Sequence, residues 1–189
     1  MSIGLYGGAF DPPHNGHLID IQYVLEKRSL DSIILMPAHI SPLKASAAAT
    51  GKQRTAMMQL AFGWLPEFTI SEYELQNSMI SYTIDTLNYL KEHQSSIELI
   101  VGYDNYLSFH RWKDFEAILS MVTLVVMRRP PFSDRNNNLP SHDSIVFLDT
   151  PLVEISSTEI RERVKAGLSI KGYTTDAVID YIRKNGLYA

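Results

Sequence analysis

Short apolar runs alternate with stretches of helical periodicity along the whole chain. The apolar runs predict buried strands at residues 3–6, 32–37, 68–71, 97–101, 121–127 and 144–148. Apolar residues at helical spacing predict helices over residues 16–28, 51–64, 81–93, 115–119, 156–166 and 175–185. In the second of these helices, Met57, Leu60, Ala61 and Trp64 share one side. The alternation predicts an α/β fold with a mainly parallel sheet and right-handed crossovers.

Polar motifs follow several of the predicted strands. Each of these strands is followed directly by one motif: Gly7-Gly8, Pro37-Ala38, Gly102-x-Asp104 or Arg128-Arg129. Parallel strands end at the same edge of a sheet, and ligands of such folds bind beyond that edge. We therefore expect these motifs on one rim of the sheet.

The segment between the first strand and the first helix has the features of an anion-binding loop. Gly7 and Gly8 let the backbone come close to a ligand, and two prolines stiffen the loop. Asn15 is predicted to cap a helix that opens at Gly16. Because the start of a helix presents unpaired N–H groups and partial positive charge, the segment predicts a phosphate site.

His14 and His17 stand beside that helix start. Two imidazoles there can donate hydrogen bonds to phosphate oxygens. Taken alone, two histidines near a turn are more often surface or cap residues. A zinc site is a poorer alternative because no further ligand cluster completes it, so no metal ligands are predicted.

Residues 155–161, Ile-Ser-Ser-Thr-Glu-Ile-Arg, form a second motif. Ser156 and Glu159 have capping-box spacing, which predicts the start of a helix. Many such strings cap helices and have no other role. Arg161 lies about one turn into that helix and can form a paired-donor contact with phosphate.

Size and composition narrow the class of protein. A chain of 189 residues predicts a single domain over residues 1–189, with a helical C-terminal portion from about residue 156. The net charge of −4 argues against nucleic-acid binding, and the lack of cysteine excludes disulfides. No secretory signal and no apolar run of about 18 residues is apparent. We expect a cytoplasmic protein with no membrane or nucleic-acid partner, and a homo-oligomer is left open.

Together the two motifs, Gly-Gly-x-Phe-Asp-Pro-x-His-x-Gly-His and Ile-Ser-Ser-Thr-x-Ile-Arg, resemble the nucleotidyltransferases marked by His-x-Gly-His. Within that superfamily the sequence is most similar to bacterial nicotinate-nucleotide adenylyltransferases. The resemblance implies a Rossmann-like nucleotidyltransferase fold, with a mainly parallel sheet flanked by helices and a small C-terminal helical part. It implies transfer of the adenylyl group of ATP to nicotinate mononucleotide, giving nicotinic acid adenine dinucleotide and pyrophosphate. Mg²⁺ is implied as a cofactor bound through the ATP phosphates.

Other readings stay open at this point. The acceptor can be another phosphate compound, such as nicotinamide mononucleotide or phosphopantetheine, or the chain can be a nucleotide-binding regulator without turnover. The segment Ser-Tyr-Thr-x-Asp-Thr-Leu at residues 81–87 and Trp112 favour a pyridine acceptor. The acid is preferred over the amide only by closeness of resemblance.

The resemblance assigns one set of residues to ATP. It implies that His14 and His17 bind phosphate oxygens, and that Lys44 and Arg161 neutralise the departing pyrophosphate; these four are the predicted catalytic residues. The Gly-x-Asp pair after the fourth strand is implied to receive adenine and ribose. The complete predicted ATP-binding set is Gly7, Gly8, Phe10, His14, His17, Gly102, Asp104, Ile155, Ser156, Ser157, Thr158 and Arg161.

A second set is assigned to the acceptor. The resemblance implies that the Trp112 ring stacks on the pyridine, and that groups around Tyr82 and Thr83 meet its carboxylate. From the residues alone, Trp112 also fits an ordinary core position, and Lys44 an exposed loop. Arg54 opens a helix, where a cation is disfavoured unless an anion is near. The complete predicted substrate-binding set is Lys44, Arg54, Ser81, Tyr82, Thr83, Trp112 and Arg129.

These assignments require one spatial arrangement. Residues 14–17 and 156–161, near opposite ends of the sequence, must meet around a triphosphate, each contributing the start of a helix.

Overall fold

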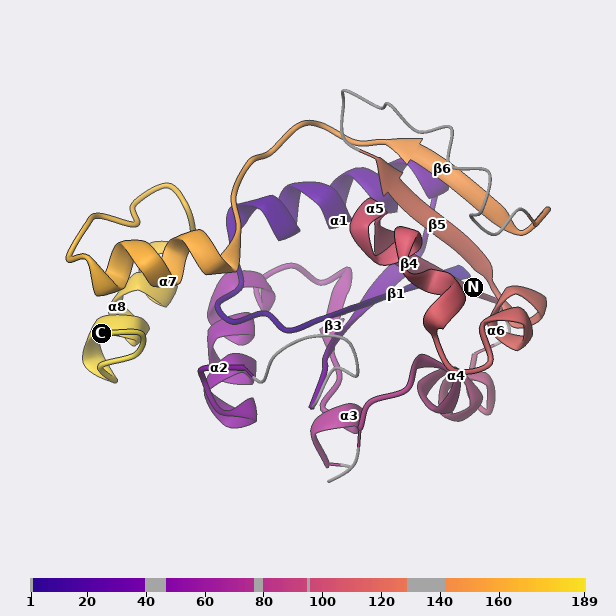
Figure 1. Ribbon diagram of the computed structural model, residues 1–189, viewed down its shortest axis with the longest axis horizontal. Helices are drawn as coiled ribbons and strands as arrows, with labels where there is room; N and C mark the ends of the chain where they lie inside the picture. Colours follow the sequence, from indigo (N-terminus) through magenta and orange to yellow (C-terminus); the bar gives the residue numbers. More distant parts are fainter. Residues whose placement is uncertain (1, 40–46, 77–79, 95, 129–141) are drawn as a thin grey trace.

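The computed structural model describes residues 2–39, 47–76, 80–94, 96–128 and 142–189 (Figure 1). Its centre is a six-stranded sheet in which all neighbouring strands are parallel. The strands are β1 (Ser2–Gly8), β2 (Ser32–Pro37), β3 (Phe68–Ile70), β4 (Ser96–Gly102), β5 (Thr123–Arg128) and β6 (Ile145–Asp149). The apolar runs therefore predicted every one of these strands, close to its observed bounds.

The order of the strands locates the ligand crevice. It is β3-β2-β1-β4-β5-β6, so the chain moves outward from β1 to β3, then crosses back to β4 and moves outward on the other side. The order reverses between β1 and β4, whose carboxyl ends flank the crevice in which such folds bind ligands. Gly8 is in register with Pro37, and Gly102 with Met127, so the predicted rim is confirmed for these motifs.

Helices cover both faces of the sheet (Figure 1). One face carries α1 (Asn15–Arg28) and α2 (Gly51–Phe62); α7 (Ser157–Lys165) and α8 (Asp176–Lys184) lie beside these two helices, with α8 against α2. The other carries α4 (Thr83–Lys91), α5 (Tyr103–Leu107), the 3₁₀ helix η1 (Phe109–Arg111) and α6 (Phe115–Met121), with the short α3 (Tyr73–Gln76) beside them. The helices of the C-terminal portion share the core of the first face, since Ile160 and Val178 belong to it.

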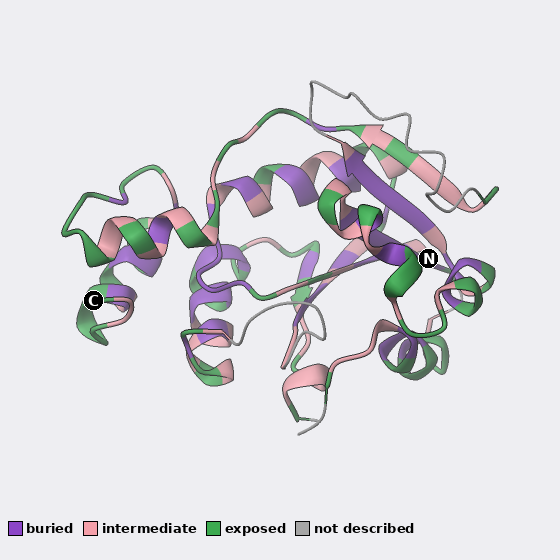
Figure 2. Ribbon diagram, viewed as in Figure 1, coloured by how far each residue is buried: buried purple, intermediate pink, exposed green. Residues whose placement is uncertain are grey.

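Each face of the sheet has its own hydrophobic core. In β5, Val125 and Met127 belong to the core under α1 and α2, whereas Leu124 and Val126 belong to the core under α4 and α6. Successive side chains of a strand point to opposite faces, so a run without polar residues fills both cores. Figure 2 shows the result as a continuous run of buried residues along the middle of β5.

Periodicity alone missed some elements and misplaced some side chains. It predicted neither α3 nor α5 nor η1, because each is too short to repeat an apolar face. The predicted helix over residues 51–64 ends at Phe62, and Trp64 beyond it is 65% exposed rather than packed beside Met57. Leu60 is also exposed.

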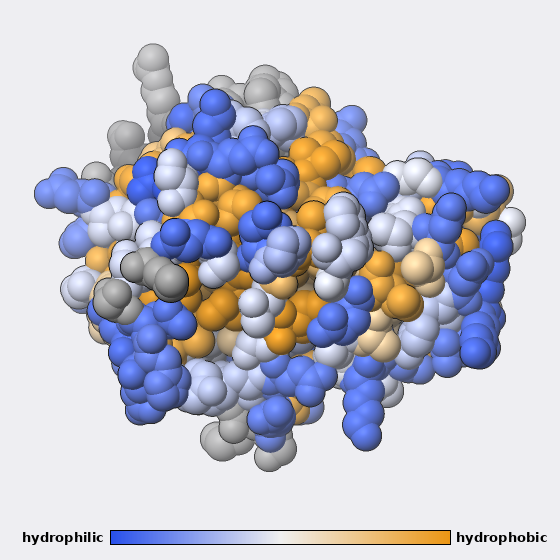
Figure 3. All heavy atoms as spheres, turned by 180° about the vertical axis from the view of Figure 1, so that it is seen from behind, coloured by the Kyte–Doolittle hydropathy of each residue, from blue (hydrophilic) through white to orange (hydrophobic). Residues whose placement is uncertain are grey.

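Apolar side chains also reach the surface. Figure 3 shows hydrophobic side chains gathered near the middle of one face, with hydrophilic ones around them. Within the described ranges, no helix is long and apolar enough to cross a membrane.

Candidate functional site

The segment between β1 and α1 turns sharply over a buried aromatic ring. Phe10 has a positive φ of 49° and is almost fully buried, with its ring centre 5.0 Å from that of His17. A Cβ at Gly8 would lie 3.2 Å from this ring, so glycine is needed for the close approach. The Phe10 side chain therefore packs against His17 inside the protein, and its assignment to ATP stays a prediction.

His14 and His17 cap the start of α1 reciprocally. Nδ1 of His14 accepts from the His17 backbone N–H, and Nδ1 of His17 accepts from the His14 backbone N–H, each at 3.2 Å. Their rings stack with centres 3.6 Å apart. The cap is thus His14 and not Asn15, whose side chain instead donates to the Gly172 carbonyl.

This capping arrangement sets the chemistry of the two rings. Because each Nδ1 accepts a hydrogen bond, the proton of the neutral imidazole is on Nε2. Nε2 is therefore the nitrogen of each ring that can donate to a phosphate oxygen.

The start of α7 lies directly against this segment. Ser157 Oγ donates to the Pro12 carbonyl at 2.7 Å, and Arg161 Nη1 donates to the Asp11 carbonyl at 2.8 Å. Ser156 caps α7 by accepting from the backbone N–H of Glu159. These contacts bring residues 156–161 against the segment directly before residues 14–17, so the predicted proximity of the two helix N-termini is confirmed.

Arg161 and Gly16 fix how closely the two helices approach. The second terminal nitrogen of Arg161 donates to Thr158 Oγ1 at 3.1 Å, which orients the guanidinium along the first turn of α7. A Cβ at Gly16 would lie 3.0 Å from His14 Nδ1 and 3.5 Å from the Ile155 carbonyl oxygen. A side chain at Gly16 would therefore require the His14 ring to move by a few tenths of an ångström, whereas its contact with Ile155 would be an ordinary one.

Arg54 supports the loops and is not open to a phosphate. It is only 2% exposed, and its two terminal nitrogens donate to the carbonyls of Ala9 and Ala38, each at 2.7 Å. Burial lowers its pKa, and the nearby Asp11 carboxylate opposes that shift. The predicted substrate contact is corrected: the anion that favours a cation here is Asp11, within the protein.

Asp11 is a central residue that motif reading did not single out. Its carboxylate is 3% exposed and accepts from the backbone N–H groups of Ala48 and Ala49 at 2.6 and 3.1 Å. The Tyr188 hydroxyl also donates to it, at 2.7 Å. Burial, and then the bond to Asp11, raises the pKa of Tyr188, so its hydroxyl stays a donor. The only feature of the nearby sequence that pointed to this role is the presence of a carboxylate in the Phe-Asp-Pro string.

The carbonyl groups of this loop are turned toward the protein. Those of residues 9, 11, 12 and 13 accept hydrogen bonds from Arg54, Arg161, Ser157 and Thr174. Carbonyl oxygens repel phosphate oxygens, whereas N–H groups attract them. The loop is therefore arranged so that an anion meets donors.

The end of β4, next to β1 in the sheet, leaves space for a ligand. Gly102 is the N-cap residue of α5, and a Cβ there would meet no atom within 4 Å. Asp104 lies exposed in the first turn of α5. A carboxylate in that position can accept from ribose hydroxyls. Lys44 and Arg129 lie outside the described residues.

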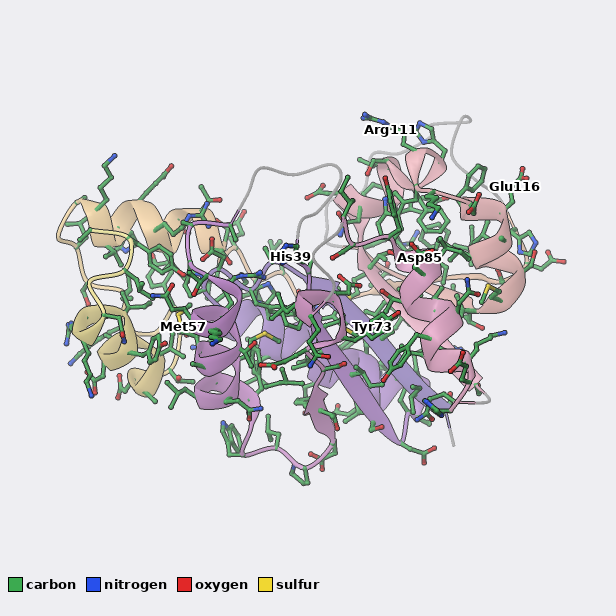
Figure 4. The ribbon with its side chains drawn as sticks, turned by 90° about the horizontal axis from the view of Figure 1, so that it is seen from below. His39, Met57, Tyr73, Asp85, Arg111 and Glu116 are labelled. Atoms are coloured by element: carbon green, nitrogen blue, oxygen red, sulfur yellow. The ribbon has the colours of Figure 1, made fainter. Side chains whose placement is uncertain are left out.

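On the other side of the crevice, Ser81 joins the start of α4 to the end of β2. Its hydroxyl accepts from the backbone N–H of His39 at 3.0 Å, and His39 lies near the middle of the molecule in Figure 4. Tyr82 is the N-cap residue of α4, and Thr83 is its first helical residue. The Asp85 N–H donates to the Tyr82 carbonyl at 3.0 Å, so it is the N–H groups before Asp85 at this helix start that can meet an anion.

Lys113 links this segment to Trp112. Its Nζ lies 3.3 Å from both carboxylate oxygens of Asp85 and 4.7 Å from the centre of the Tyr82 ring. Trp112 packs partly buried against Phe109, with ring centres 5.1 Å apart. The predicted acceptor residues at 81–83 and 112 are thus brought to the same side of the sheet.

Glu74 of α3 stabilises that segment and was not predicted. Its carboxylate accepts from Thr86 Oγ1 at 2.6 Å, and burial raises the pKa of Glu74. No sequence pattern marked it, because its partner lies on another helix.

A family model described as cytidylyltransferase-like matches residues 5–163. The chain belongs to the cytidylyltransferase-like family. The sheet order with its reversal beside β1 is the Rossmann-like arrangement expected of this family.

Relatives within the family sharpen this placement. A protein of Hydrogenobaculum sp. named probable nicotinate-nucleotide adenylyltransferase is 39% identical over the whole chain and 99% of the relative. One of Dictyoglomus thermophilum with the same name is 40% identical, with both chains fully covered. The nicotinic acid mononucleotide adenylyltransferase of Plasmodium falciparum, solved in complex with NaAD, shares the fold with a TM-score of 0.81 at 21% identity, over 99% of this chain and 97% of that one. The resemblance to nicotinate-nucleotide adenylyltransferases is confirmed.

Proposed function

We propose that the chain transfers the adenylyl group of ATP to nicotinate mononucleotide, giving nicotinic acid adenine dinucleotide and pyrophosphate. One observation carries the chemistry: α1 and α7 start side by side at the switch point, joined through Ser157 and Arg161. The names of the full-length relatives and the NaAD complex of the Plasmodium relative support this choice of acceptor.

The reaction is an in-line displacement at phosphorus. A phosphate oxygen of the acceptor bonds to the α-phosphorus of ATP, the bond from that phosphorus to the bridging oxygen breaks, and pyrophosphate leaves with the electron pair. Such transfers depend on positioning and on charge stabilisation. We assign the Nε2–H donors of His14 and His17 to the phosphate oxygens, and Arg161 to the departing pyrophosphate.

The acceptor is held on the other side of the crevice. We assign the exposed part of the Trp112 ring to stacking on the pyridine, and the N–H groups at the start of α4 to its carboxylate. An acid gains more than an amide from these donors because its charge is negative. This is the physical basis for choosing nicotinate over nicotinamide mononucleotide.

Mg²⁺ fits this site as a partner of the phosphates. The donors gathered here are nitrogens of His14, His17 and Arg161, which suit phosphate oxygens and not a bare cation. Within the described part of the chain, no group of three or more His, Asp or Glu side chains forms a metal site. An ion held by phosphate oxygens and water needs none, and when bound it neutralises triphosphate charge.

The setting of the reaction follows from its substrates. ATP and pyridine mononucleotides are charged and do not enter a bilayer core readily. We therefore propose a cytoplasmic location. Self-association stays a prediction, which light scattering of the purified chain can test.

The decisive experiment measures Mg²⁺-dependent pyrophosphate release from ATP with each acceptor in turn: nicotinate mononucleotide, nicotinamide mononucleotide and phosphopantetheine. We expect the highest kcat/KM with the acid, and mass spectrometry identifies the dinucleotide. No release with either pyridine mononucleotide would overturn the proposal, and faster turnover of the amide would overturn the choice of acid.

A further inference from the structure

We propose that Tyr188 is a positioning residue for the phosphate loop, defined as residues 9–14, and that it acts through the buried carboxylate of Asp11. The proposal rests on the proposed function in one respect, that this loop binds the phosphates of ATP. Tyr188 Oη donates to Asp11 Oδ1 at 2.7 Å, across nearly the whole length of the sequence.

The bond completes the environment of a buried charge. Asp11 receives two backbone N–H donors, from Ala48 and Ala49, and Tyr188 is the third donor. A buried carboxylate is costly unless its oxygens are hydrogen-bonded. Without the phenol, the longer bond from Ala49, at 3.1 Å, is the one that Oδ1 keeps among the described residues. The carboxylate would then seek other donors, and the loop would shift with it.

Asp11 transmits any such shift to two assigned phosphate ligands. Its carbonyl accepts from Arg161, and its main chain is three residues from His14. The segment after α8 can therefore affect the positions of both Arg161 and His14 through Asp11. Misplacement of catalytic groups by about 1 Å can cost about 10²-fold in rate, so a single distant hydroxyl can matter.

The segment that carries Tyr188 is itself held firmly. Gly186 has a φ of 57°, its N–H donates to the Arg183 carbonyl, and the Leu187 N–H donates to the Ile182 carbonyl. This is the Schellman arrangement that ends a helix in one defined direction. Leu187 and Tyr188 then pack against the core under α1 and α2. The phenol is thus delivered to Asp11 by a fixed turn.

The test removes one oxygen atom and compares it with a matched control. Tyr188→Phe keeps the packed ring and deletes the donor. Tyr181→Phe makes the same change on a ring in the same core, at a hydroxyl that makes no hydrogen bond with any described residue. Steady-state kinetics are measured well below the melting temperature of each variant, and the affinity for ATP is measured by calorimetry without acceptor.

We expect Tyr188→Phe to lower kcat/KM for ATP about tenfold and to weaken ATP binding, with the KM for the acceptor unchanged. Tyr181→Phe should match the wild type. If Tyr188→Phe lowers only the melting temperature and leaves ATP kinetics and affinity equal to those of Tyr181→Phe, Tyr188 is merely structural and the proposal is overturned. If the wild type turns over no pyridine acceptor but Tyr188→Phe still weakens ATP binding, the proposed function fails and the positioning role stands.

Discussion

The two sides of the crevice are held by different kinds of contact. One side, called the phosphate side here, contains the phosphate loop of residues 9–14. On this side, Asp11 and Arg54 are almost completely buried, and their hydrogen bonds join segments from both ends of the sequence. On the acceptor side, Lys113 and Asp85 form an ion pair whose side chains are 44% and 54% exposed. Buried, charge-assisted hydrogen bonds fix geometry far more firmly than exposed ion pairs do.

The difference matches what each side has to do. Transfer at phosphorus gains its rate from groups that are in place before the reaction, so the phosphate side benefits from rigidity. An acceptor has to enter and its product has to leave, which weaker contacts permit. Substitutions should therefore have large effects on the phosphate side and small effects on the acceptor side.

The largest effect is expected at His17. His17→Ala should lower kcat about 10²–10³-fold, since it removes a donor aimed at developing charge. His17→Gln is the matched control for stability, because a glutamine at the third helical position preserves the capping acceptor. Both variants are compared by kcat and by thermal unfolding. Near-normal turnover by folded His17→Ala would contradict the assignment of His17.

The second prediction concerns Arg54, whose buried hydrogen bonds should contribute to the free energy of unfolding. Arg54→Met should lower the free energy of unfolding by about 2–4 kcal/mol, because it leaves the carbonyls of Ala9 and Ala38 unpaired in a buried place. Urea denaturation measures the change. Lys52→Met, on the exposed face of the same helix, is the control and should stay within about 0.5 kcal/mol of the wild type. A similar loss in both variants would show that helix charge matters more than the buried bonds.

The features of the fold and the site that could be predicted from the sequence are those that depend on residues close together in the chain. Strands, helix starts and the two phosphate motifs were readable because each depends on neighbours in sequence. The role of Arg54 was misread, although the argument behind it was sound: a cation at a helix start does have an anion beside it. That anion is Asp11, and no local pattern reveals a partner contributed by another element.

The capping of α1 shows the limit of residue preferences. Asn15 is a common cap residue, yet the cap is His14, because His17 three positions later can return a second hydrogen bond. The neighbouring chain decides as well, since the main-chain N–H of Asn15 donates to the Tyr173 carbonyl. Propensity was overruled by a reciprocal bond three residues away together with a contact far along the sequence.

On the acceptor side, Glu74 makes stability depend on pH. Burial raises the pKa of Glu74, so the folded protein keeps this proton to higher pH than the unfolded chain. The folded state therefore loses stability as pH rises from the unfolded-state pKa through the folded-state pKa. Glu74→Gln should remove that fall, so that the melting temperature depends less on pH above the ordinary pKa of a glutamate. An unchanged pH profile in the variant would show that Glu74 is solvated.

Lys113 should show the smallest effect. Lys113→Met removes an exposed ion pair with Asp85 and a cation–π contact with Tyr82, which together contribute about 1 kcal/mol. We expect the KM for nicotinate mononucleotide to rise up to about fivefold, with kcat and the KM for ATP unchanged, and the difference from wild type to shrink at high salt. Lys91→Met, an exposed lysine in the last turn of α4, is the control. A fall in kcat as large as that of His17→Ala would mean that the acceptor side is as rigidly organised as the phosphate side, and the contrast between the two would not hold.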